Sequence, residues 1–78
     1  MHQLFETARQ KVAKADHGDE EWETAQDAVH GLRRLAQRMF VPETHQVLTH
    51  LERAVTAAEE QDASGVMQHL RLAESELP

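Results

Sequence analysis

Apolar residues recur along this chain at intervals of three and four, the spacing that places side chains on one face of an α-helix. The pattern is most regular in the second of four such segments, where it predicts an amphipathic helix over residues 20–40. Acidic residues crowd the start of this segment and arginines its end, and both clusters complement the helix macrodipole. Its apolar stripe is Trp22, Ala25, Val29, Leu32, Ala36 and Met39, widened on one side by Ala28 and Leu35.

The first segment predicts a helix over residues 2–16, and the third predicts a helix over residues 42–61. We expect Gly18 to end the first helix and Asp19 to be the N-cap of the next one. Val41-Pro42 separates the second helix from the third, because the residue before a proline avoids the α conformation. The stripes are Leu4, Phe5, Ala8, Val12 and Ala15 in the first helix, and Thr44, Val47, Leu48, Leu51, Ala54, Val55 and Ala58 in the third.

The end of the third helix has two interpretations. Continuing its spacing forward would place Asp62 and His69 in the core, whereas the apolar residues that follow are shifted by about one position. The shift coincides with Asp62, a good N-cap, and with Gly65, so we predict a break and a fourth helix over residues 62–77. The alternative is a three-helix protein with one long C-terminal helix. The stripe of the last segment is Val66, Leu70, Ala73 and Leu77.

Short connections make consecutive helices antiparallel neighbours. The predicted fold is therefore all-α: a small antiparallel four-helix bundle made of two helical hairpins, in a single domain over residues 1–78. Because so short a chain buries a small core, we expect it to pair as a homodimer. An offset of 43 superposes the first helix on the third and Asp19 on Asp62, so duplication of a hairpin is an alternative to chance similarity of amphipathic helices.

The composition argues against several classes of function. Without cysteine the chain has no disulfide, thiolate metal site or cysteine nucleophile. A net charge of −6 argues against binding to nucleic acid or to an anionic membrane, and the basic residues form no single stripe with interleaved aromatic side chains. The sequence shows neither a signal peptide nor an apolar run that spans a bilayer, so we expect a cytoplasmic protein.

The six histidines are the most prominent chemical feature. No two of them have the spacing of three or four residues by which one helix presents two metal ligands on one face. A metal site between helices would use residues such as His50 and His69, and scattered boundary histidines are the simpler interpretation. The acidic segments 19–23 and 59–62 lie at predicted helix ends, where water solvates them. The macrodipole disfavours the carboxylates at the C-terminal end of the third helix, and a basic partner would offset this repulsion.

We expect no enzymatic activity and no cofactor. The chain has no glycine-rich phosphate loop, and neither of its serines, Ser64 and Ser75, lies in a nucleophile motif. So small a bundle also has little interior to spare for a pocket that excludes water.

Gly31 is the residue that folding alone explains least. It lies in the middle of the second helix, opposite the apolar stripe, where glycine costs about 1 kcal/mol relative to alanine. Since glycine lets another backbone approach closely, we predict a contact face there, with Leu72 of the fourth helix as a second exposed contact. The predicted face is Asp27, His30, Gly31, Arg34 and Arg38.

The predicted function is a non-catalytic helical module that self-associates or docks onto a partner helix. The alternative is a small metal- or ligand-binding bundle that uses interhelical histidines.

Overall fold

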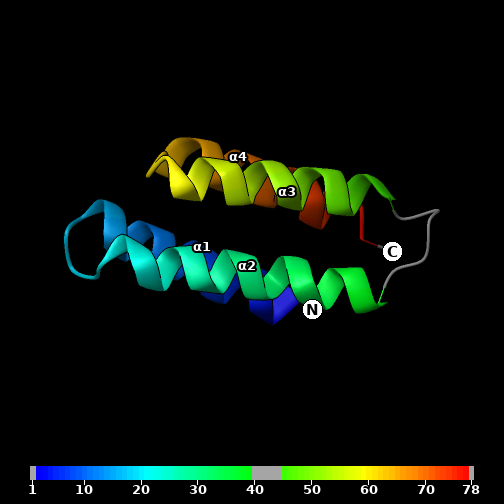
Figure 1. The fold of residues 1–78 in the computed structure, drawn as a ribbon, viewed down its shortest axis with the longest axis horizontal. Coiled ribbons are helices and arrows are strands. Elements are labelled where there is room, and N and C mark those ends of the chain that lie inside the picture. The colour runs from blue at the N-terminus through cyan, green and yellow to red at the C-terminus, as the bar shows by residue number, and fades with distance from the viewer. Residues whose placement is uncertain (1, 40–44, 78) are drawn as a thin grey trace.

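The computed structural model describes residues 2–39 and 45–77, and this part of the chain contains four α-helices (Figure 1). They are α1 (His2–Asp16), α2 (Trp22–Met39), α3 (His45–Glu59) and α4 (Ala63–Ser75). The prediction of four helices is confirmed, and the alternative with one long C-terminal helix is wrong because the chain turns at residues 60–62. The predicted helix end at Phe40, the Val41-Pro42 break and the stripe position Thr44 lie outside the described residues.

The helices form a closed ring. Consecutive helices pack against each other, and α4 returns to pack against α1. Hairpin α1–α2 forms the lower layer in Figure 1 and hairpin α3–α4 forms the upper one. The predicted antiparallel four-helix bundle of two helical hairpins is therefore confirmed. Packing is most extensive within the α3–α4 hairpin.

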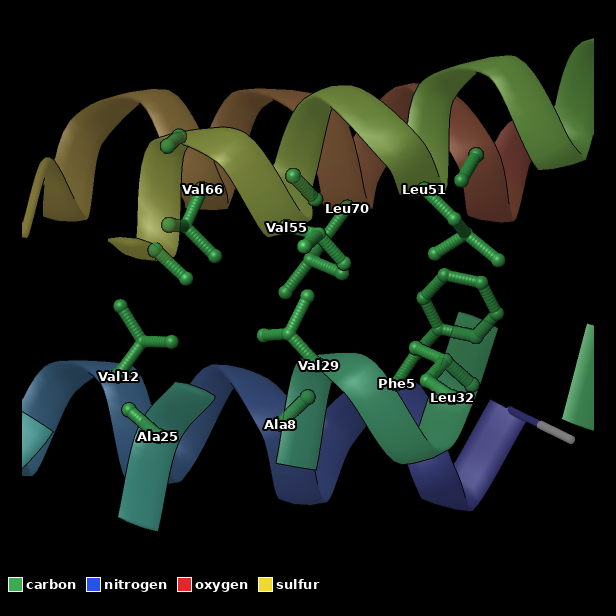
Figure 2. Close-up of a cluster of buried hydrophobic side chains, with 14 of the residues drawn as sticks. Phe5, Ala8, Val12, Ala25, Val29, Leu32, Leu51, Val55, Val66 and Leu70 are labelled. Carbon is green, nitrogen blue, oxygen red and sulfur yellow. The ribbon is translucent and has the colours of Figure 1, made fainter. Parts of the chain in front are cut away.

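The core lies between the two hairpins, and its buried side chains are all apolar in the described part of the chain. Figure 2 shows side chains of the lower hairpin pointing toward those of the upper one, with Phe5 next to Leu51. Removing this apolar surface from water is the main stabilising term of the fold. The buried residues are Phe5, Ala8, Val12, Ala15, Ala25, Val29, Leu32, Ala36, Val47, Leu51, Ala54, Val55, Ala57, Ala58, Val66, Leu70 and Ala73.

Two members of the predicted stripes are exposed instead. Leu4 is 44% exposed and Met39 is 57% exposed, so their assignment to the core is wrong. Consecutive residues point about 100° apart around a helix. Because Phe5 occupies the core, Leu4 is left at the edge of α1. Met39 is the last residue of α2, beyond the last buried residue of that helix, Ala36.

The turn after α1 is a Schellman C-cap. Gly18 has a φ of 84°, and its N–H donates to the carbonyl oxygen of Ala15 at 3.1 Å. The N–H of Asp19 donates to the carbonyl oxygen of Lys14 at 2.8 Å. Gly18 as the C-terminal glycine is thus confirmed. Asp19 as an N-cap is wrong, because this motif uses Asp19 to close α1, and α2 begins only at Trp22.

The turn after α3 repeats this arrangement. Gln61 has a φ of 58° and donates to Ala58, and Asp62 donates to Ala57 at 2.9 Å. Here α4 follows at once, because the Oδ1 atom of Asp62 accepts a hydrogen bond of 3.0 Å from the Gly65 N–H, which confirms Asp62 as an N-cap. The two caps correspond at the offset of 43 residues, but α2 starts two residues later after its turn than α4 does.

Candidate interaction surface

A groove runs between α1 and α2 on the side of this hairpin that is turned away from the core. Its volume is about 410 Å³ and its lining is mainly apolar. Exposed Leu4 and half-buried Leu35 provide the largest apolar surface, while Lys11 and Asp27 provide the charges. The lining residues are Leu4, Thr7, Lys11, Asp27, Ala28, Gly31, Leu32 and Leu35.

Gly31 leaves room in this groove that the fold itself does not use. A Cβ atom built on Gly31 would meet no atom within 4 Å, and its φ lies outside the left-handed range that favours glycine. Within the described chain, neither packing nor backbone conformation therefore requires glycine here. Its cost to the helix, about 1 kcal/mol relative to alanine, has no compensation inside the monomer.

The structure divides the predicted contact face. Asp27 and Gly31 line the groove, and Arg34 and Arg38 are exposed on the same outer side of α2. His30 does not join them, because its ring is turned toward α3. Leu72 is 38% exposed on α4, so it does lie off the core, but it belongs to the other hairpin and is not part of the groove lining.

His30 instead lies beside a carboxylate of α3. Its Nε2 atom is 3.4 Å from Oε1 of Glu59, the last residue of that helix. A carboxylate at a helix C-terminus faces the negative end of the macrodipole. His30 is therefore the side chain that lies beside the carboxylate at this end of the helix, where a basic partner was expected.

Six lining residues are missing from the predicted contact face: Leu4, Thr7, Lys11, Ala28, Leu32 and Leu35. The apolar stripes place Ala28 and the three leucines on the core side, and Thr7 and Lys11 carry no signal of their own. One signal was available for Leu4: it and Phe5 are adjacent, and two large apolar side chains about 100° apart around a helix cannot both occupy one narrow core face.

His50 and His69 lie on facing sides of α3 and α4. His50 follows Gln46 by one turn, and the Gln46 amide, oriented so that its nitrogen faces α4, donates to the Glu76 carboxylate at 3.1 and 3.2 Å. His69 follows Gly65 by one turn, and a Cβ on Gly65 would lie 3.2 Å from a side chain of α3. The two predicted candidates are thus on the same interhelical boundary.

The surroundings of these rings do not suit a metal site. The Nδ1 atoms of both His50 and His69 are buried without a hydrogen-bond partner. A histidine that binds a metal through Nε2 carries its proton on Nδ1, where a carboxylate, carbonyl or water normally accepts it. Among the described residues, moreover, no three His, Asp or Glu side chains are grouped closely enough to hold a metal ion together.

A charged cluster joins α1 to α4. Arg9 Nη1 donates to Oε1 of Glu74 at 2.6 Å, and His2 Nδ1 lies 2.8 Å from Oε2 of the same carboxylate. The hydrogen bond with His2, followed by the bond and the positive charge of Arg9, lowers the pKa of Glu74, although partial burial opposes this shift. The cluster links α1 to α4 and lies outside the groove lining.

Comparison of the chain with protein-family models, with curated proteins and with solved structures gives no match. None of the described helices is long and apolar enough to cross a membrane. Functional inference therefore starts from the surface of the bundle and from the groove in particular.

Proposed function

We propose that this protein is a non-catalytic interaction module that binds a helix of another protein molecule in the groove between α1 and α2. The observation that carries the proposal is Gly31, which weakens α2 and leaves open space that no atom of the bundle fills. A helix that approaches α2 closely at this point makes use of the missing side chain. Exposed Leu4 and half-buried Leu35 offer apolar contacts beside it.

The shape of the site also fits this function better than a reaction centre. The groove is mainly apolar, and the only charged residues in its lining are Lys11 and Asp27. Recognition of a helix in an apolar groove requires anchors and close approach and no activated acid, base or nucleophile. Glu74, whose pKa is lowered by its contacts with His2 and Arg9, lies outside this lining.

Site-specific photo-crosslinking in the organism that encodes the protein tests this function. A photoreactive amino acid is placed at Gln10, an exposed position of α1 that precedes Lys11 of the groove lining in the sequence. The matched control carries it at Gln68, an exposed position on α4. We expect a discrete crosslinked protein from position 10 that is absent from position 68 and is lost when Leu35→Glu is added.

Products that form equally from both positions, or that persist with Leu35→Glu, would show that the groove is not the binding site. The absence of any product from position 10 in cells that produce the folded protein would contradict the proposal as a whole. Circular dichroism of the Leu35→Glu variant checks that its helices are retained.

A further inference from the structure

The charges on the outer side of α2 are separated into two groups. The acidic residues Glu23 and Asp27 precede Gly31, and the basic residues Arg34 and Arg38 follow it. All four charged side chains are exposed, and none forms an ion pair with another described residue. The face of the helix is therefore negative in one half and positive in the other.

The macrodipole accounts for Glu23 and Arg38, which lie in the first and last turns of α2, but not for Asp27 and Arg34. Glu23 and Asp27 are one turn apart, as are Arg34 and Arg38, and like charges at this spacing destabilise a helix. The macrodipole favours acidic residues in the first turn and basic residues in the last, and its effect fades beyond them. Asp27 is already the sixth residue of α2, and Arg34 is the sixth from its end.

The two groups are placed symmetrically. Residues 27 and 34 are equidistant from the point midway between residues 30 and 31, and so are residues 23 and 38. If two α2 helices cross antiparallel at this point, Asp27 of each lies opposite Arg34 of the other, and Glu23 lies opposite Arg38. Parallel pairing would instead bring acidic residues against acidic residues. The face is thus complementary to an antiparallel copy of itself.

Gly31 lies next to this midpoint, and its open side allows two backbones to approach there. We infer that two copies of this chain form a two-fold symmetric dimer through the outer faces of their α2 helices, with the two Gly31 residues at the crossing. Leu4 and Leu35 border the contact and supply its apolar part. This inference rests on the proposed function and names a second copy of the chain as the occupant of the groove.

Charge reversal in solution tests the pairing. Sedimentation velocity from micromolar to millimolar concentration, at low ionic strength, should show the mass rising from 8.9 kDa toward twice that value. Asp27→Arg alone and Arg34→Asp alone place like charges across the axis, so each should weaken the dimer by about tenfold or more. Mixing these two variants should restore a one-to-one dimer, because each then supplies the charge that the other lacks. The double variant should restore the homodimer.

Two controls carry the same charge changes on other faces. Glu52→Arg on α3 and Arg71→Asp on α4, both at exposed positions, should leave the dimer unchanged. Gly31→Leu, which fills the crossing point, should abolish pairing while the helical content is kept. High salt should weaken the wild-type dimer.

A wild-type chain that stays at 8.9 kDa over the whole range would overturn the inference, as would a dimer that is insensitive to both charge reversals and to Gly31→Leu. The crosslinking experiment separates these failures from failure of the proposed function. A crosslink from position 10 to a different protein, with the isolated chain monomeric, contradicts the dimer and supports the groove. A crosslink at twice the mass of the chain supports both.

Discussion

Gly31 and Gly65 both lie in helices of this bundle, but their environments are opposite. A Cβ at Gly31 would face open space, whereas a Cβ at Gly65 would collide with the Asp62 carboxylate that caps α4 and would lie 3.2 Å from Cβ of Ala57. One glycine is therefore dispensable for folding, and the other makes room for a cap and for a neighbouring helix.

Alanine substitution at these two positions should have opposite effects. Gly31→Ala should raise the free energy of unfolding by about 1 kcal/mol, since alanine is the better helix former. That gain corresponds to a rise in Tm of roughly 4–8 °C for a domain of this size. Gly65→Ala should not give this stabilisation, because the added Cβ would displace the Asp62 cap and crowd Ala57 of α3. Thermal unfolding at micromolar concentration measures both, and equal stabilisation at the two positions would contradict the geometry.

Gln61 adopts a backbone conformation that glycine adopts more easily. Its φ of 58° lies in the left-handed region, which costs an L-residue about 1–2 kcal/mol. Glycine removes this cost, but it also loses more conformational entropy on folding. The net effect of Gln61→Gly should be a stabilisation of about 0.5–1 kcal/mol. The reciprocal change, Gly18→Ala, should destabilise it. Denaturant unfolding of the two variants gives both signs, and destabilisation by Gln61→Gly would contradict this account.

The start of each hairpin's second helix shows how far local sequence rules reach. Asp19 and Asp62 both follow a residue that ends a helix, and both are good N-cap residues. Asp62 caps α4, whereas two more residues separate Asp19 from α2. Propensity identifies the turn but does not fix its length, which depends on where the second helix must begin to pack against the first.

The two aspartates therefore form a matched pair for mutagenesis. Asp62→Ala should lower the free energy of unfolding by about 1 kcal/mol, because the Gly65 N–H loses its acceptor. Asp62→Asn should keep most of the stability, since the amide oxygen also accepts. Asp19→Ala should change little by comparison. Chemical denaturation of the three variants decides the matter; a larger loss at residue 19 than at residue 62 would reverse the assignment.

Helix α1 is tied to α4 by an interaction that depends on pH. The lowered pKa of Glu74 means that its carboxylate stabilises the folded state fully above the ordinary value of 4.5. This contribution is lost as the pH falls below 4.5 and through the lower pKa of the folded state. Wild-type protein should therefore lose stability over this interval relative to Glu74→Gln, and the two should converge at more acidic pH.

Unfolding by urea at a series of pH values measures this difference. Glu52→Gln, at an exposed carboxylate that forms no ion pair with another described residue, is the control and should parallel the wild type. A Glu74→Gln profile that is also parallel to the wild type would show that the cluster does not stabilise the fold.

At the scale of the whole molecule, periodicity was sufficient to predict the bundle, its four helices and most of its core. The phase slip near Asp62 correctly distinguished two helices from one. Periodicity could not show which helix stands on which side of α2, because it separates inward from outward positions and leaves the handedness of the ring open. The pattern therefore groups His30 with Gly31, whereas the structure places His30 against α3. For the same reason the pattern does not show that α1 contributes to the groove.

The structure also changes the reason for expecting a dimer. The shortness of the chain predicts a dimer because it predicts a small core, yet Phe5, Leu51 and Leu70 are fully buried within a single chain. Self-association is instead argued from the outside of the bundle, from Gly31 and the separated charges of α2. Dissociation should therefore leave each chain folded, and variants that abolish pairing should retain their helical content.

His2 Nδ1, at the start of α1, lies 2.8 Å from Glu74 Oε2, near the end of α4. The two ends of the chain therefore lie toward the same end of the bundle (Figure 1). A short glycine–serine linker between the two ends of the chain would preserve every contact of the core. New termini could then be opened in the exposed turn at residues 17–19. Such a circular permutant, with the helix order α2–α3–α4–α1, should give a wild-type circular dichroism spectrum and should unfold cooperatively.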